Sequence, residues 1–476
     1  MSSVVGVMFL AAAFIVATWS RLDLPLGRSH DGINTAVWMN GGRAIVEDGL
    51  VHSRLGATTA VFGTYAHHPP GLYLIGATAY LIGGTRPFVA RLPAVISVVV
   101  GLALAWAFLR TIGRSRLACF GALSLAVTTP MLLLWGPMLN HEAIAFPWAF
   151  AALLVAARAQ HGRPVPAWLA ATVGFGAAIL SWQGGLLVLL LAMTPVVSRW
   201  RRSAETDRRV YLALGVAAVV ALALTVAWQL WSYGDLRDVI DAFGLRAGEA
   251  NTQYGFVEAQ VRFAYQSFPL WTIALAAYGL LFIWRDAANA STSAALISTV
   301  VLYTVGFRNG ATIHVYWSFW LVLVVVVATS AAIDRHMPQA PSVQVGFLCA
   351  AVVMVVAYAT LIDTKGADSI VIGARAGDVV LHTPVPKGQE TFYVFSDVDE
   401  PPPWLLYEVQ RPVGLLTDPA EVRRLATDQP NAVVMIQRSF VDKVRVGVFD
   451  AIAPKAIVAR DPYESVRIDD LAAALG

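Results

Sequence analysis

The chain contains long stretches with almost no charged residue, such as residues 4–19, 210–231 and 343–359. Each stretch approaches or reaches the roughly 20 apolar residues that a helix needs to cross a bilayer. The first stretch lacks the basic segment of a secretory signal and is followed by further apolar stretches, so we interpret it as a retained helix. The pattern therefore predicts a protein that crosses the membrane many times.

Arginine residues gather in short segments between the apolar stretches, and these segments set the topology. Because short cytoplasmic loops collect Lys and Arg, we place the clusters at residues 110–116, 158–163 and 199–209, with Arg285 and Arg335, inside the cell. This assignment predicts about eleven spanning helices, a cytoplasmic N-terminus and an external C-terminus. The helices are expected at residues 4–20, 92–109, 117–136, 143–157, 166–182, 185–198, 210–232, 269–284, 293–306, 317–333 and 343–362.

One further apolar stretch, residues 70–83, is short. If it crossed the bilayer, the basic cluster that follows it would move outside, against the distribution of positive charge. We therefore predict a helix that lies in the membrane interface, within a long outer loop over residues 21–91. A second outer segment, residues 233–268, carries several charged residues, Arg246 among them. The segment could cover a site, although for any single charge in it we prefer the interpretation of a solvated loop.

The C-terminal residues have a different pattern. Residues 391–396 and 431–437 are typical of strands, residues 418–428 of a capped helix between them, and residues 456–459 of a third strand. This alternation indicates a small α/β domain, and it contains no glycine loop of the phosphate-binding kind. The predicted fold is therefore a polytopic α-helical membrane domain, residues 1–362, followed by an extracytoplasmic α/β domain, residues 363–476.

Composition agrees with this fold. Of 476 residues, 57% are hydrophobic and 14% are charged, whereas about 25% are charged in an average soluble domain. The two cysteines, Cys119 and Cys349, each lie in an apolar stretch, which excludes a disulfide framework and a thiolate metal site. We expect membrane lipid, and no nucleic acid, as a partner. High usage of Ala, Val and Arg is typical of a bacterium with GC-rich coding.

Candidate chemistry lies at predicted outer helix ends, beginning with residues 29–34. Asp31 could accept a proton from an alcohol, but taken alone it is better interpreted as a cap of the helix expected over residues 33–47. In the next segment, His67 and His68 precede two prolines. Imidazoles there can bind a phosphate or a metal, and the alternative is a turn whose histidines lie among lipid headgroups.

Two later segments carry further candidates. Glu142, in Asn140-His141-Glu142, lies at the outer end of a helix, where a functional carboxylate and an exposed interfacial acid are equal alternatives. In the last segment, Arg308 and His314 could neutralise a phosphate. The adjoining Tyr316 and Trp317 are typical of an aromatic belt at headgroup level.

Taken in this order, the segments resemble the GT-C membrane glycosyltransferases, in particular the branch with protein O-mannosyltransferases and the lipid A aminoarabinose transferase. The resemblance depends on Asp31 after the first helix, on His68-Pro69-Pro70 with Ala90-Arg91-Leu92-Pro93, and on Glu142 after a Thr-Pro helix end. It covers the first 150 residues and residues 303–317, and elsewhere only the topology matches. Many members carry Lys where this chain has His68 and Gln183, so its phosphate-binding groups differ in detail.

The resemblance implies inverting transfer of a hexosyl or pentosyl group from a polyprenyl-phosphate donor. The acceptor would be a hydroxyl of a glycolipid, polysaccharide or protein at the outer face of the bacterial inner membrane. Asp31 would deprotonate this hydroxyl, and Glu142 would orient the acceptor, hold a cationic partner or help to bind a divalent metal. No obligatory cofactor is expected, and metal dependence stays open. The candidates for substrate binding are His30, Asn34, His67, His68, Arg91, Arg308, His314 and Tyr316.

Two other functions compete with this one. A secondary transporter would place polar residues along a path at mid-bilayer, whereas the polar clusters of this chain stand at helix ends. A membrane scaffold with an external binding domain would leave the histidine and acid clusters without a purpose. The sequence therefore favours the enzyme over the transporter and the scaffold.

Overall fold

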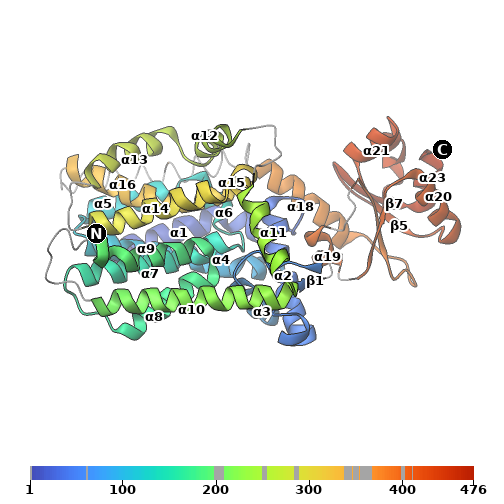
Figure 1. The fold of residues 1–476 in the computed structure, drawn as a ribbon. Coiled ribbons are helices and arrows are strands. Elements are labelled where there is room, and N and C mark those ends of the chain that lie inside the picture. The colour runs from blue at the N-terminus through green and yellow to red at the C-terminus, as the bar shows by residue number, and fades with distance from the viewer. Residues whose placement is uncertain are drawn as a thin grey trace. The chain divides into compact units, whose positions relative to one another are not determined.

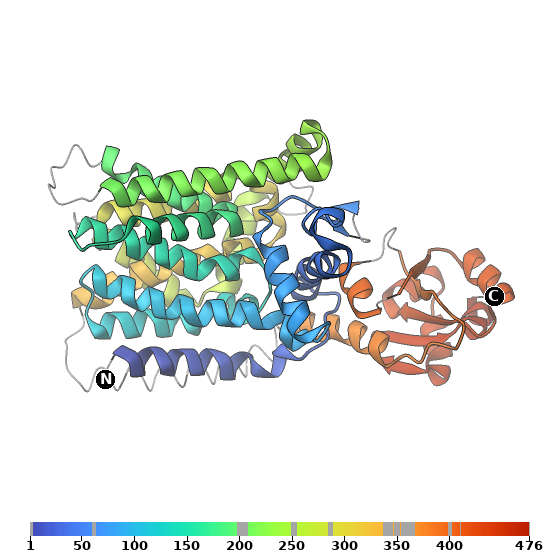
Figure 2. The same cartoon turned by 90° about the horizontal axis from the view of Figure 1, so that it is seen from below.

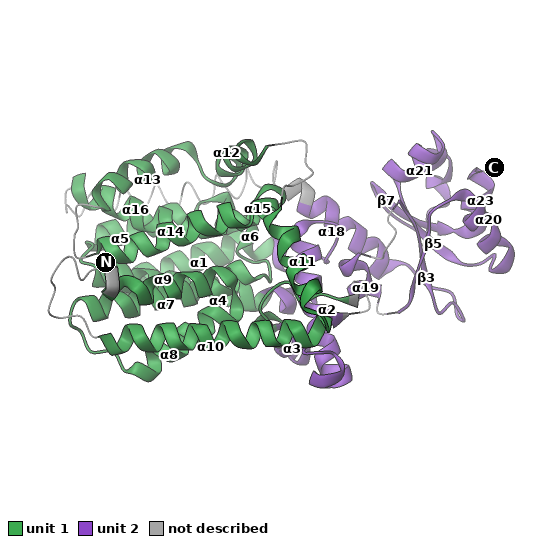
Figure 3. Ribbon diagram, viewed as in Figure 1, with its two compact units in different colours: residues 1–20, 64–75, 92–362 green, residues 21–63, 76–91, 363–476 purple. Residues whose placement is uncertain are grey.

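The computed structural model of the chain describes residues 3–59, 63–197, 208–248, 255–283, 289–336, 367–397, 402–409 and 411–475, with the isolated residues 346 and 353. These residues form two compact units (Figure 3). Unit 1 comprises Met1–Ser20, Thr64–Ile75 and Leu92–Ile362, and unit 2 comprises Arg21–Gly63, Gly76–Arg91 and Asp363–Gly476. Most of the predicted first outer loop is thus grouped with the C-terminal residues, and the functional domains at residues 1–362 and 363–476 stay a prediction.

Helices make up nearly all of the chain before residue 337 (Figure 1). They are α1 (Ser3–Leu22), α2 (His30–His52), α3 (Gly71–Gly83), α4 (Pro87–Thr111), α5 (Arg116–Val127), α6 (Pro130–Trp135), α7 (His141–Gln160), α8 (Ala167–Leu180), α9 (Trp182–Val197), α10 (Arg208–Tyr233), α11 (Leu236–Ala247), α12 (Phe256–Ser267), α13 (Leu270–Ile283), α14 (Ala290–Gly306), α15 (Arg308–Ile313), the 3-10 helix η2 (Val315–Trp320) and α16 (Leu321–His336). Two short strands, β1 (Thr58–Thr59) and β2 (Gly63–Thr64), lie between α2 and α3.

Several helices have the length and composition to cross a membrane. In the described part of the chain these are Val4–Leu22, Pro87–Thr111, His141–Gln160, Arg208–Tyr233 and Val315–His336. The pair α12 and α13, bent by 111°, adds a sixth span if it counts as one. The chain is thus a multi-pass membrane protein, but the predicted number of eleven is not confirmed. The helix expected over residues 343–362 lies outside the described residues.

Local sequence explains where the helices begin and break. The single helix expected over residues 117–136 is instead divided into α5 and α6, because Pro130 has no backbone N–H to continue the first helix. Thr129 caps α6 by accepting the Leu132 N–H at 3.2 Å. The stretch expected to lie in the interface is helical as α3, and its orientation in the membrane stays a prediction.

The helices of unit 1 run side by side, as the views in Figures 1 and 2 both show. Helices α8 and α9 pack against α10, and helices α5 and α13 pack against α16. Small residues lie at these contacts, which lets the backbones approach closely, as is common between membrane helices. At Gly279 of α13, a Cβ atom would overlap the backbone oxygen of Ala328 in α16.

Unit 2 contains a five-stranded sheet. The C-terminal elements are α18 (Ala367–His382), β3 (Phe392–Phe395), α19 (Pro403–Val409), β4 (Val413–Leu416), α20 (Pro419–Asp428), β5 (Val433–Gln437), α21 (Arg438–Val444), α22 (Val448–Ile452), η3 (Ala453–Lys455), β6 (Val458–Arg460), β7 (Tyr463–Arg467) and α23 (Ile468–Leu475). The strand order is β4-β3-β5-β7-β6. Strand β3 is parallel to β4 and β5, while β7 is antiparallel to β5 and β6.

The predicted α/β architecture of the C-terminal residues is confirmed. The expected strands over residues 391–396 and 431–437 are β3 and β5, and the expected helix is α20. Asp418 caps this helix, since its carboxylate accepts the N–H groups of Ala420 and Glu421 at 2.6 and 3.0 Å. The third expected strand is found as β6, shifted toward the C-terminus, whereas β4 and β7 were not predicted.

Replacement of Gly279 by Ala should destabilise unit 1, because the added methyl group pushes α13 away from α16. We expect a loss of about 1–3 kcal/mol, the usual cost of overpacking. The control is Gly244→Ala in α11, where a Cβ atom meets nothing within 4 Å. Thermal unfolding of the purified protein should show a lower midpoint for G279A alone, and equal midpoints for the two variants would contradict this packing.

Candidate functional site

The loop that carries His67 and His68 is held in place by side chains of unit 1. The Trp182 Nε1–H donates to the His67 carbonyl oxygen at 3.0 Å, and the Gln229 amide donates to the Ala66 carbonyl oxygen at 2.8 Å. Two prolines follow His68 and restrict the backbone further. The positions of both imidazoles are therefore fixed from α9 and α10.

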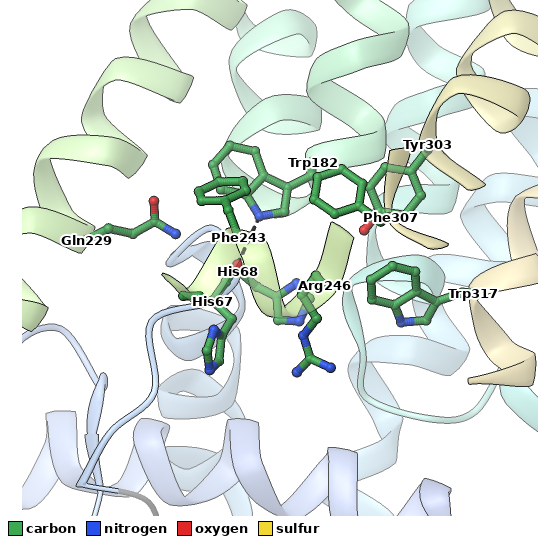
Figure 4. A pocket seen from close by; sticks show the side chains of 10 residues that line it. His67, His68, Trp182, Gln229, Phe243, Arg246, Tyr303, Phe307 and Trp317 are labelled. Carbon is green, nitrogen blue, oxygen red and sulfur yellow. Dashed lines mark hydrogen bonds between the residues drawn. The ribbon is translucent and has the colours of Figure 1, made fainter. Parts of the chain in front are cut away.

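A small cavity of ≈ 10 Å³ lies beside this loop (Figure 4). His67, His68 and Arg246 supply its basic side chains, and Figure 4 shows them next to a group of aromatic rings. The rest of its lining consists of Trp182, Gln229, Ala242, Phe243, Tyr303, Phe307 and Trp317. The cavity brings positive charge and flat apolar surfaces together, and in this structure it has room for about one water molecule.

Groups that can carry positive charge surround His68. Its ring stacks on that of His141 with the centroids 4.3 Å apart. Burial lowers the pKa of His68 well below its ordinary value, and repulsion from His141, Arg246, His67 and His314 lowers it further. Burial, followed by repulsion from Arg246, lowers the pKa of His67 to about 4. The site therefore gathers basic groups that disfavour one another's charge.

Glu142 contributes the negative charge next to this group. Its side chain is 1% exposed, so the alternative of an exposed interfacial acid is wrong. His141 Nε2 lies 2.8 Å from Glu142 Oε1, the separation of an ion pair, although the two groups are not oriented for a hydrogen bond. Asn140 caps α7 and accepts the His141 N–H at 2.9 Å, which places both side chains at the helix start.

Only some residues of the segment around His314 lie at the cavity, Trp317 among them. The His314 ring stacks on that of Tyr316 with the centroids 5.1 Å apart. Tyr316 and Trp317 are buried and pack together with Tyr303, so the prediction of an aromatic belt was wrong for them. Arg308 is exposed and lies over the Phe256 ring, 5.2 Å from its centroid, and it does not line the cavity.

Arg246 and His141 were missed as site residues. We interpreted Arg246 as one of the solvated charges of an outer segment, but that segment forms two helices, and α11 places Arg246 at the cavity. The amphipathic pattern of residues 236–247 was the available signal, because it indicates a helix with one face on the protein. For His141, its place next to Glu142 was the only signal.

Asp31 and Arg91 lie together in unit 2, where both are buried, at 4% and 2% exposure. Arg91 donates to Asp31 Oδ2 from Nε at 3.1 Å and from Nη2 at 2.6 Å. No hydrogen bond from the described residues reaches Oδ1, which is therefore the oxygen open to a proton. The alternative role of Asp31 as a helix cap is wrong: α2 begins at His30, and Ser29 caps it by accepting the Gly32 N–H.

The other two candidates of this segment lie on α2 in unit 2. His30 is exposed, and Asn34 donates to the His30 carbonyl oxygen at 2.7 Å. Their predicted contact with substrate stays a prediction. As for metals, no three His, Cys, Asp or Glu side chains in the described ranges are arranged to hold one ion. Metal dependence therefore also stays open.

His67 should make stability depend on pH. The pKa of the His67 imidazole is about 4 in the folded protein and 6.5 in the unfolded chain. The stability that the neutral imidazole contributes is therefore fully present above pH 6.5 and is lost as pH falls toward 4. The loss amounts to up to about 3 kcal/mol. Thermal unfolding midpoints of wild type and His67→Gln should therefore converge below pH 6.5. The exposed His52 provides the control H52Q. A difference in unfolding midpoint between wild type and H67Q that stays constant with pH would refute the prediction.

Comparison with known proteins agrees with this architecture. Residues 67–231 match the family described as dolichyl-phosphate-mannose-protein mannosyltransferase. No match was found among curated protein sequences. In structure, the chain is similar to ArnT from Cupriavidus metallidurans bound to undecaprenyl phosphate, with a TM-score of 0.65 and 15% identity over 98% of both chains.

Two further solved structures are similar over most of this chain. Archaeal oligosaccharyltransferase AglB from Archaeoglobus fulgidus, in complex with an inhibitory peptide and a dolichol-phosphate, has a TM-score of 0.54 and 12% identity, covering 92% of this chain and 69% of AglB. Arabinofuranosyltransferase AftD from Mycobacteria has a TM-score of 0.50 and 16% identity, covering 91% and 35%. The predicted resemblance is thereby confirmed, and the protein has the membrane-embedded fold of the GT-C glycosyltransferases.

Proposed function

We propose that the protein is an inverting glycosyltransferase that moves a sugar from a polyprenyl-phosphate donor to an acceptor hydroxyl. The observation that carries this proposal is the cavity of unit 1, where basic groups from separate segments gather beside aromatic rings. The likeness to ArnT, which was solved with undecaprenyl phosphate, supports the same class of donor. The sugar would be a hexosyl or pentosyl group.

The donor phosphate would lie at His67, His68 and Arg246. Burial and mutual repulsion lower the pKa of both imidazoles, and a bound anion raises it again. The imidazoles can therefore hold protons when the donor is bound. Arg246 supplies a permanent positive charge with several donors for phosphate oxygens. As the bond from the sugar to the phosphate breaks, these fixed charges stabilise the charge that develops on the leaving group.

Glu142 would act through His141. The pair at 2.8 Å gives the imidazole a counter-charge, and His141 in turn stacks on His68. Among the three roles that we considered for Glu142, this geometry supports the one that holds a cationic partner. His314 adds to the basic group, as its repulsive effect on a charged His68 indicates.

Asp31 would be the general base. Its Oδ1 takes the proton of the acceptor hydroxyl, the hydroxyl oxygen forms a bond with the anomeric carbon, and the phosphate leaves with the electron pair of the bond that breaks. Attack opposite the leaving group inverts the anomeric centre. Arg91, whose guanidinium already donates to Asp31, would orient this carboxylate and would not bind the phosphate as we first expected.

Catalysis would take place at the outer face of a bacterial inner membrane, with the N-terminus in the cytoplasm and the α/β domain outside. The acceptor would be a glycolipid, a polysaccharide or a protein. Purified protein supplied with a panel of undecaprenyl-phosphate sugars and analysed by mass spectrometry tests for transfer, whereas uptake into vesicles without transfer would favour a transporter.

Replacement of Asp31 by Asn should abolish transfer while the donor still binds. Removal of a general base costs about 10²- to 10⁴-fold in rate. We expect this loss in kcat, with an unchanged Kd for undecaprenyl phosphate, because the cavity is untouched. Asp48 on the same helix is exposed, so D48N is the control. A folded D31N that transfers sugar at the wild-type rate would remove Asp31 from this role.

Replacement of Arg246 by Gln should weaken donor binding. A charge-assisted hydrogen bond is lost, which predicts an increase of about 10-fold or more in the Kd for undecaprenyl phosphate. Arg237 stands on the same helix and is exposed, so R237Q provides a matched control with the same change in net charge. Equal affinities of R246Q and R237Q would place the phosphate elsewhere.

A further inference from the structure

Glu408 is a buried carboxyl group that the mechanism above does not use. It lies on α19, is 7% exposed, and belongs to unit 2. Its Oε1 accepts the backbone N–H of Leu26 at 2.7 Å. Burial raises the pKa of Glu408 to about 8, against the opposite effects of the Leu26 N–H and of Arg91. Burial therefore favours the neutral form of this group, and its Oε1 serves as a hydrogen-bond acceptor.

The backbone that Glu408 contacts also contacts Arg91. Arg91 Nη1 donates to the carbonyl oxygens of Leu22 and Leu24 at 3.2 and 2.5 Å. The other guanidinium nitrogens, Nε and Nη2, donate to Asp31. The turn over residues 22–26 is thus bonded to Arg91 through two of its oxygens and to Glu408 through one N–H. Displacement of this turn would move the two carbonyl groups that orient the guanidinium.

Elements from the C-terminal part of the chain also contact the residues that follow this turn. The Arg28 N–H donates to the Gly373 carbonyl oxygen of α18 at 3.1 Å. A Cβ atom on Gly27 would overlap that carbonyl group, so the two backbones are in direct contact. On α2, the Asn40 amide donates to the Pro403 carbonyl oxygen at 2.9 Å, which fixes the start of α19. Residues far apart in sequence therefore determine where the turn lies.

We propose that Glu408 is a positioning residue for the Asp31–Arg91 pair. By accepting the Leu26 N–H, it fixes the carbonyl groups of Leu22 and Leu24, which orient the Arg91 guanidinium and, through it, the Asp31 carboxylate. This role rests on the proposed function, since it assigns the C-terminal segment a part in the geometry of the base. Glu408 itself does not touch the substrate.

Two replacements of Glu408 separate positioning from folding. E408Q keeps a neutral side chain of the same shape with an oxygen that can accept the Leu26 N–H, whereas E408A removes the acceptor. We expect E408A to lower kcat by roughly 10- to 100-fold, the cost of a displaced catalytic group. The KM for the donor should change by less than about 2-fold, because the donor cavity is unaltered. E408Q should restore wild-type kcat, and the exposed Glu390 supplies the control E390A.

Hydrogen exchange provides a measurement that does not depend on transfer. In full-length E408A, peptides that contain residues 22–31 should exchange faster than in wild type, E408Q and E390A, while peptides of the sheet strand β5 should not. Kinetics use the undecaprenyl-phosphate sugar that wild type transfers. An E408A with wild-type kcat and unchanged exchange at residues 22–31 would overturn the inference.

If the proposed function is wrong, the experiment gives a result that differs from failure of the Glu408 role. In that case wild type transfers none of the undecaprenyl-phosphate sugars, and exchange at residues 22–31 decides the inference by itself. Faster exchange in E408A, reversed in E408Q, supports the role of Glu408 in holding the turn. Unchanged exchange refutes it whether or not wild type is an enzyme.

Discussion

The Asp31 carboxylate and the Arg91 guanidinium are both buried in unit 2, and each is stable there because the other neutralises its charge. The pair also needs hydrogen bonds for the remaining donors, and the carbonyl groups of Leu22 and Leu24 supply them. A carboxylate fixed through one oxygen keeps the other oxygen available. In the proposed mechanism, the same contacts that make burial tolerable also leave Asp31 one oxygen for proton transfer.

The cavity of unit 1 follows the opposite arrangement. There, His67, His68 and Arg246 oppose one another's positive charge, and nearby His141 and His314 add to the effect on His68. Such a gathering of like groups costs stability in the absence of a ligand, and it is typical of sites that bind an anion. Trp182 holds the loop before α3 through its hydrogen bond to the His67 carbonyl oxygen, and its ring packs against that of Phe243 on α11, the helix that carries Arg246.

Unit 2 joins the C-terminal residues to the segment that follows the first helix. Its sheet has a core of its own, yet α18 and α19 contact the turn that follows the first helix. Close contact of the backbones at Gly27 and Gly373 requires that neither residue carries a side chain. The C-terminal residues therefore contribute to the surroundings of Asp31.

The sequence by itself determined the apolar helices and the α/β pattern of the C-terminal residues, and it identified Asp31, His67, His68 and Glu142 as candidates. These features depend on composition and periodicity over short windows, which are local properties of the chain. Only the tertiary structure decided that Arg91 pairs with Asp31, that Arg246 lines the cavity, and that Glu408 contacts Leu26. Each of these is a contact between residues far apart in sequence, and the partner of a buried polar group is chosen by packing, which no local pattern encodes.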